Sequence, residues 1–284
     1  MVFVPNYNDI NISLRDLFNK GYVHGFLKFD STTAAGSTNC IEFQTGASHN
    51  LVSQKLAGNV AVKYKAPQHG LTLTEKWSTE NVLGTVVEVK DQFAKGLKVV
   101  FDTTYVPHST KRGGLIKTEW VGDLMKVNAD ITLQGGPVLV LSGVVARQSW
   151  LFGAQGKLDF STNELKNTSV AIAHQTPEYA IHSYSNDGRE FGASIFHRPH
   201  KNVELGAQLS WMVGDQSTRF GLAGKYRVNN DLLVRAKVDN NSQVGVSATH
   251  ELNSAVKLTL SSQFGLLATD SAMKLGLGVE YKLT

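Results

Sequence analysis

The chain has 284 residues, is 42% hydrophobic and carries a formal net charge of +4 at pH 7. Its mean hydropathy is −0.15, and no stretch approaches the roughly 18 to 20 apolar residues of a membrane helix, which excludes a helical membrane protein. The basic residues are spread singly, without a Lys/Arg block or zinc-finger spacing, so no nucleic-acid partner is expected.

The start of the chain gives a first indication of its compartment. The stretch MVFVPNYNDI has neither the basic and apolar regions of a secretory signal nor an Arg-rich amphipathic presequence. Cys40 is the only cysteine, so the chain can form no internal disulfide. We therefore expect a reducing compartment that is reached without secretion.

A short amphipathic helix is expected in about the first twenty residues. Its apolar side chains recur at spacings of three and four, which places them on one helical face: Tyr7, Ile10, Leu14, Leu17 and Phe18. Gly21 supplies a stop, and Gly21 and Gly25 frame a hinge in the sequence GYVHG. Such a helix either packs on the structure that follows it or lies on a membrane surface.

From Phe26 onward the hydrophobic pattern changes to strict alternation, which is typical of strands. Clear examples lie at 55–65, 96–105, 203–211, 219–227, 256–264 and 274–282. Turn sequences such as PQHG, SNDG and DNNS separate them. Units of about 13 or 14 residues give about 19 or 20 strands in the remaining chain. We therefore predict two regions, a helix and hinge at 1–25 and an all-β barrel at 26–284.

The alternation by itself does not place the barrel in a membrane, because a soluble sandwich would show it too. Uniform strand length, aromatic residues near strand ends and the lack of helices to cover so large a sheet favour a transmembrane β-barrel with the helix inside the pore. Two alternatives stay open, namely a soluble β-rich ligand-binding protein and a bacterial-type porin. A bacterial-type porin is expected to carry a signal peptide.

The polar face of the expected strands carries roughly twice as many basic as acidic side chains, so a water-filled lumen lined by it attracts anions. The basic residues expected to line the pore are Lys28, Lys63, Lys98, Lys117, Arg219, Lys225, Arg235 and Lys257. The helix is expected to dock its apolar stripe on the wall and to present Arg15 and Lys20 to passing anions.

The stretch GLTLTEKW at 70–77 places a carboxylate on an apolar face. Side chains of a strand alternate, so Glu75 shares its face with Leu73 and Trp77. In a membrane barrel that face meets lipid, which penalises the charged form of Glu75. The alternative is a residue close enough to the membrane interface to stay hydrated.

No motif of an enzyme is found, since the P-loop, the nucleophile elbow and the zinc-protease helix are all missing. His197 and His200 have a metal-like spacing, but Pro199 interrupts a regular scaffold and nothing completes the ligand set. We therefore expect a turn at 197–200, no metal, no cofactor and no enzymatic activity.

Several stretches resemble the mitochondrial voltage-dependent anion channel, the mitochondrial porin of eukaryotes. They are GLTLTEKW, KGLKVVFD, NDGREFGASIF, STRFGLAGKY and the final KLGLGVEY, and NYNDINISLRDLFNKGY is similar to the pore helix of that family. The resemblance covers essentially the whole chain. It implies a barrel of about 19 strands, closed by parallel pairing of its first and last strands in the mitochondrial outer membrane. It also implies a voltage-gated, weakly anion-selective diffusion channel for ions, nucleotides and metabolites such as ATP, ADP and NADH.

The resemblance further implies roles for particular residues. Nucleotide contacts fall near Lys20 and Arg15, and on Gln243, Val244, Gly245, Ser261, Ser262, Gln263, Phe264 and Gly265. Ile12 stands where the family often has lysine, which weakens the match there. A membrane-insertion signal falls on Lys274, Gly276, Val279 and Tyr281. Glu75 matches a carboxylate tied to gating motion and to docking of hexokinase. The implied partners are membrane lipid, hexokinase and apoptosis regulators, and a homo-oligomer is left open.

Overall fold

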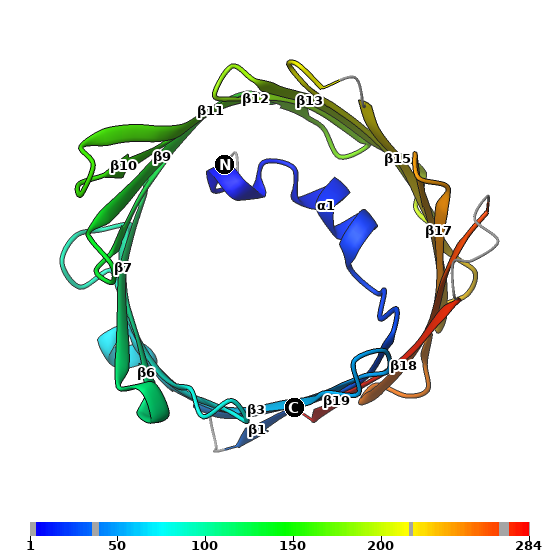
Figure 1. Ribbon diagram of the computed structural model, residues 1–284, viewed down its shortest axis with the longest axis horizontal. Coiled ribbons are helices and arrows are strands. Elements are labelled where there is room, and N and C mark those ends of the chain that lie inside the picture. The colour runs from blue at the N-terminus through cyan, green and yellow to red at the C-terminus, as the bar shows by residue number, and fades with distance from the viewer. Residues whose placement is uncertain (1–3, 36–39, 216–217, 267–272, 284) are drawn as a thin grey trace.

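A closed β-barrel of 19 strands surrounds a short helical segment (Figure 1). The computed structural model describes residues 4–35, 40–215, 218–266 and 273–283. The helical segment comprises η1 (Tyr7–Asp9) and α1 (Ile12–Asn19). The strands are β1 (Phe26–Ala35), β2 (Ile41–Asn50), β3 (Leu56–Ala66), β4 (Leu71–Ser78), β5 (Leu83–Lys90), β6 (Leu97–Val106), β7 (Lys111–Val121), β8 (Met125–Thr132), β9 (Val138–Arg147), β10 (Trp150–Asp159), β11 (Glu164–Gln175), β12 (Tyr179–Asn186), β13 (Glu190–His200), β14 (Val203–Met212), β15 (Thr218–Arg227), β16 (Leu232–Asp239), β17 (Gln243–Glu251), β18 (Val256–Gly265) and β19 (Lys274–Leu283). Two 3₁₀ turns, η2 (Pro67–His69) and η3 (Pro107–Ser109), follow β3 and β6.

The barrel closes where β1 pairs in parallel with β19, in a register that sets Leu27 opposite Leu277. The other edge of β1 pairs with β2 in the antiparallel sense. An odd number of strands requires one parallel pair. When strand direction alternates along the chain, the first and the last of 19 strands point the same way, so they are parallel where they meet. Closure leaves no free sheet edge. The predicted barrel of about 19 strands and its parallel closure are confirmed.

The alternation along each strand separates an apolar outer face from a polar inner face. Phe29, Phe101 and Leu205 are exposed on the outer face, whereas Lys28, next to Phe29, lines a cavity inside the barrel. Exposed apolar side chains recur round the whole barrel, and an apolar band of this kind is stable only when lipid surrounds it. The fold is therefore that of a transmembrane barrel.

The first part of the helical segment packs on the inner face of β9 to β11. Ile10 is 1% exposed and joins a buried cluster with Val144 and Leu151. Gly153 on β10 leaves room for it, because an added Cβ would lie 2.6 Å from the Ile10 Cδ1 atom. Burying one such aliphatic side chain stabilises the docked state by about 1.5 to 3 kcal/mol.

Helix α1 packs on the next part of the wall, beside β13 to β15 (Figure 1). Leu14 and Leu17 are buried with Phe196 and Ala223 in a second cluster. An added Cβ at Gly206 on β14 would collide with Leu14. The expectation that the apolar stripe docks on the pore wall is confirmed. No helix among the described residues is both long and apolar enough to cross a membrane.

The helical segment differs from the single helix that the sequence predicts. It breaks at Ile10 and Asn11 into η1 and α1. The asparagines of this region favour turns over helix interiors, and the break lets the two parts follow two apolar areas of a curved wall. The wall begins at Phe26, and the division of the chain into a helix with its hinge at 1–25 and a barrel at 26–284 stays a prediction.

The predicted turn at 197–200 is wrong. Strand β13 runs to His200, with a register shift between His197 and His200. Such a bulge accommodates Pro199 within a strand, because proline has no backbone N–H and a bulged residue does not need to donate a hydrogen bond to the neighbouring strand. Among the described residues, no group of three or more His, Cys, Asp or Glu side chains is placed to hold a metal ion.

Candidate pore and N-terminal gate

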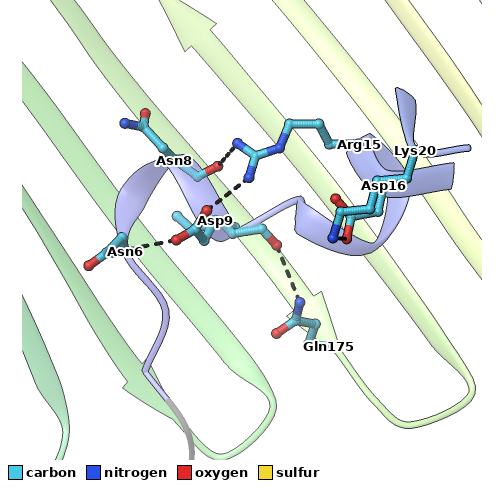
Figure 2. A network of polar contacts seen from close by, with 8 residues as sticks. Asn6, Asn8, Asp9, Arg15, Asp16, Lys20 and Gln175 are labelled. Carbon is cyan, nitrogen blue, oxygen red and sulfur yellow. Dashed lines mark hydrogen bonds and ion pairs between the residues drawn. The ribbon is translucent and has the colours of Figure 1, made fainter. Parts of the chain in front are cut away.

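Arg15 of α1 and Lys20, which directly follows α1, are both held by carboxylates of the helical segment (Figure 2). Arg15 donates to Asp9 Oδ1 at 2.9 Å and to the backbone carbonyl oxygen of Asn8 at 2.7 Å. Lys20 Nζ lies 2.6 Å from Asp16 Oδ2. Both ion pairs are largely exposed and contribute at most about 1 kcal/mol each. Arg15 and Lys20 therefore present less free positive charge to the lumen than the sequence indicates, although an anion can compete for them.

The break in the helical segment is tied directly to the wall. The side-chain amide of Gln175, on β11, donates to the backbone carbonyl oxygen of Ile10 at 3.2 Å (Figure 2). This bond satisfies a carbonyl that the interrupted helix leaves without an intrahelical partner. Gln175 is a docking residue that the sequence analysis missed, because nothing in its own strand pattern marks it.

The hinge, residues 21–25, runs along the inner faces of β16 to β19. The backbone N–H of Val23 donates to Ser261 Oγ on β18 at 3.0 Å. Lys237 Nζ, on β16, donates to the carbonyl oxygen of Phe18 at 2.7 Å and lies 4.3 Å from the centroid of the Tyr22 ring. The expected hinge is therefore bound to the wall at several points.

Both glycines of the hinge adopt backbone conformations that favour glycine. Their φ angles are +79° at Gly21 and +77° at Gly25, in the left-handed region that other residues rarely enter. An added Cβ at Gly21 would also collide with the guanidinium group of Arg235. Glycine is thus required at Gly21 on two grounds, backbone angle and space.

All eight basic residues that were predicted to line the pore face the lumen, but they form two groups. One group pairs with carboxylates: Lys28 with Asp30 at 2.6 Å, Lys98 with Glu88 at 2.9 Å, Lys225 with Glu204 at 2.9 Å and Lys257 with Glu251 at 2.6 Å. Among the ion pairs formed between described residues, none includes the other group: Lys63, Lys117, Arg219 and Arg235.

Alternation along the strands does not predict which carboxylates pair with these basic residues. Glu204 lies directly opposite Lys225 across the β14/β15 pair, and Glu251 lies opposite Lys257 across β17/β18. These pairs depend on strand register, which alternation alone does not fix. Half of the expected positive charge is therefore locally compensated.

Five of the predicted basic residues converge on one cavity of about 580 Å³ between the hinge and the wall. They are Lys20, Lys28, Lys225, Arg235 and Lys257. The carboxylates of Asp30, Glu251 and Glu280 share this lining. Lys98 and Lys117 lie apart, in a cavity of about 320 Å³ beside residues 6–9.

The stretches implied to bind nucleotides do not present one continuous surface. Gly245 and Ser261 face inward, where His24 and Val23 cover them, and Gln243, Gln263 and Gly265 share that inner face by alternation. Val244, Ser262 and Phe264 project outward, so only five of the eight residues face the lumen, where a nucleotide would pass. The reason is geometric, because consecutive strand residues point to opposite faces.

Glu75 projects from the outer face of β4, between Val62 and Thr85 on the neighbouring strands. The Thr85 hydroxyl donates to Glu75 Oε2 at 2.9 Å. Trp77, on the same face, is 61% exposed. Glu75 is three residues from the end of β4 at Ser78, which is roughly 10 Å along the strand. The carboxylate thus lies within the outer apolar band and has one hydroxyl donor of its own.

The four residues matched to an insertion signal divide between the two faces of β19. Lys274 and Gly276 face inward, opposite Gln263 and Ser261, whereas Val279 and Tyr281 face outward. Gly276 also has a structural reason to be glycine, because an added Cβ would collide with the backbone of Val23.

A closed barrel with an apolar outside, a polar lumen and a helical segment docked on its inner wall defines a pore-forming membrane protein. The chain belongs to the eukaryotic porin family, whose sequence model matches residues 4–276. A probable voltage-dependent anion-selective channel of Caenorhabditis elegans is 52% identical over 277 residues and covers 98% of each chain. The non-selective voltage-gated ion channels VDAC2 of Meleagris gallopavo and VDAC1 of Rattus norvegicus are 40% and 37% identical, over 99% of this chain and 95% and 100% of theirs.

Proposed function

We propose that this protein is a voltage-gated, weakly anion-selective diffusion channel of the mitochondrial outer membrane, open to ions, nucleotides and small metabolites. The names of its relatives support voltage gating and channel activity. Membership in the eukaryotic porin family favours this function over a soluble binding protein and over a bacterial-type porin. The mitochondrial location rests on the resemblance of the sequence motifs to the mitochondrial channel.

The observation that carries the selectivity is the set of lumen cations that take part in no ion pair among the described residues. Lys63, Lys117 and Arg219 face the lumen from β3, β7 and β15. Fixed positive charge along a water-filled passage raises the local concentration of anions and lowers that of cations. The preference is weak, because many of the other basic side chains are compensated by ion pairs.

The experiment is a reversal-potential measurement on the purified protein in a planar bilayer that separates two concentrations of KCl. We expect the high-conductance state to pass chloride more readily than potassium. Raising both concentrations should weaken the preference, since the Debye length falls from about 10 Å at 0.1 M to about 3 Å at 1 M. Cation selectivity of the high-conductance state contradicts the proposal.

Anionic metabolites such as ATP, ADP and NADH are the proposed larger solutes. The cavity beside the hinge supports this, because Lys20, Lys225 and Arg235 converge there and phosphates prefer such clusters of donors. Gly245 and Ser261 lie beneath the hinge. Contact of a nucleotide with these two residues therefore requires the hinge to move first.

We propose further that Glu75 is a lipid-exposed carboxylate that contributes to gating motion and to docking of hexokinase. The place of Glu75 in the outer apolar band supports the contribution to gating motion, since lipid disfavours a charge at this depth. The roles of hexokinase and of apoptosis regulators as partners rest on the resemblance alone. Loss of hexokinase binding to membranes that contain Glu75→Gln would support the docking role, and unchanged binding would exclude it.

Labelling by an apolar carbodiimide tests the exposure of Glu75 to lipid. We expect the reagent to partition into the bilayer and to modify Glu75 in the wild type but not in Glu75→Gln. Glu75→Gln should also stabilise the barrel by about 1 kcal/mol, because it removes a charge that lipid penalises. Mass spectrometry locates the label, and selective modification of a lumen carboxylate such as Asp102 would show that the faces are assigned wrongly.

A further inference from the structure

The ring of His24, in the hinge, lies against the inner wall, and neither of its nitrogens has a hydrogen-bond partner among the described residues. Nδ1 and Nε2 are both buried without a partner. The ring lies over the backbone of Gly245 on β17, where an added Cβ would be 2.9 Å from Nε2. Its centroid lies 5.3 Å from that of Tyr22. A neutral imidazole tolerates this site, whereas an imidazolium would bring a second N–H donor that finds no acceptor.

The charges around His24 are positive on both sides. Burial lowers the pKa of His24, and Lys237 on β16 and Lys274 on β19 lower it further. Tyr22 adds no negative charge, because burial raises the pKa of its hydroxyl to about 12.

The other groups that face the hinge do not compensate. Gly245 and Ser247 on β17 and Ser261 on β18 carry no charge. On β16, Asp239 interacts with Lys237, and Arg235 adds another cation beside Tyr22. Helix α1 contributes the Phe18 carbonyl, which Lys237 already occupies. The carboxylates of Asp30, Glu251 and Glu280 face the part of the hinge formed by Gly21, Tyr22 and Val23. Among the described residues, the charged groups that act on the pKa of His24 are the two cations Lys237 and Lys274.

We propose that His24 is a proton-sensitive anchor of the hinge: the neutral ring lets residues 21–25 lie on the wall, and protonation drives them away from β16 to β19. The bonds from Val23 to Ser261 and from Lys237 to the Phe18 carbonyl lie within six residues of each other along the N-terminal segment. They are therefore lost together when the hinge leaves the wall. Because α1 directly precedes the hinge in the chain, acidification loosens the C-terminal end of the docked helix.

The direction of the pH dependence follows from linkage. The pKa of His24 is lower in the docked hinge than in a released, hydrated one, where it takes the ordinary value of about 6.5. Docking is then at full strength above about pH 6.5 and weakens as the pH falls below that value. At pH 5.5 the ratio of docked to released hinge falls by up to about tenfold.

A spin label at an exposed position of α1 tests this. Asn19→Cys in a Cys40→Ser background places the label next to the hinge, and its electron paramagnetic resonance spectrum separates immobile from mobile populations. In the full-length protein in lipid vesicles, we expect the docked-to-released ratio to fall by up to about tenfold between pH 7.5 and 5.5. With His24→Phe, which keeps a ring but cannot take a proton, we expect a change of less than about twofold.

Two further variants sharpen the result. His24→Lys carries a permanent charge and should show a released hinge at both pH values. His182→Gln removes another inner-face histidine, on β12, and should respond as the wild type does. A wild-type response that persists in His24→Phe overturns the proposal, as does a hinge that stays docked at pH 7.5 in His24→Lys. The His24→Phe comparison decides the question by itself if His24→Lys does not insert.

Discussion

Replacing Lys63, Lys117 and Arg219 together by glutamate is expected to turn the anion preference of the pore into a cation preference. The three side chains face the lumen, and none takes part in an ion pair among the described residues. Each substitution lowers the net charge by two units, so the combined change is larger than the formal net charge of +4. The reversal potential in about 0.1 M KCl, where charges act over roughly 10 Å, measures the change.

A matched control exchanges the two members of an existing pair. Lys257→Glu combined with Glu251→Lys keeps the cross-strand ion pair, whose atoms lie 2.6 Å apart, and leaves the charge of the lumen unchanged. Its selectivity should equal that of the wild type. If the triple variant kept its anion preference, the wall cations would not be its source, and the proposed electrostatic mechanism would fail.

Substituting alanine for Leu14 and Leu17 together is expected to release α1 from the wall and to alter voltage-dependent closure. The two side chains are 1% and 2% exposed, and truncating a buried leucine costs about 2 to 5 kcal/mol. The substitutions destabilise the docked state of the helix. They leave the barrel intact, because the barrel closes through the pairing of β1 with β19 and does not need the helix. Single-channel conductance and the half-closure voltage in planar bilayers measure the effect.

Deleting residues 1–20 should likewise leave a conducting barrel with altered closure.

Ile12→Ala provides the control, because Ile12 belongs to the same helix but is 38% exposed. Its gating should match that of the wild type.

The steepness of closure should change less than its midpoint in the double variant. The charges of Asp9 and Asp16 cancel those of Arg15 and Lys20, and a membrane voltage acts only on net charge that moves. Gating that is unchanged in the double variant would exclude the helix as a gate.

The sequence determined the faces of the wall, because strand side chains alternate whatever the rest of the fold does. Leu275 and Val279 project outward and Lys274 inward, as the pattern of the last strand predicts. The number of strands followed from chain length and the length of one strand with its turn. The apolar stripe of the N-terminal helix followed from helical periodicity. Each of these features depends on local geometry, which the order of residues specifies directly.

Only the tertiary structure decided which charges are free. Lys225 and Lys63 read alike in the sequence, and each lies opposite a glutamate. Lys225 pairs with Glu204, whereas Glu42, opposite Lys63, pairs with Lys65. Register sets such partners, and a shift of one residue would change every one of them.

The place of the hinge was likewise decided only in three dimensions. His24 meets Lys237 and Lys274, which lie more than two hundred residues further along the chain. No local pattern encodes that approach. It arises because closure of the barrel brings the last strands beside the first, and because Gly245 and Gly276 leave the space that the hinge fills.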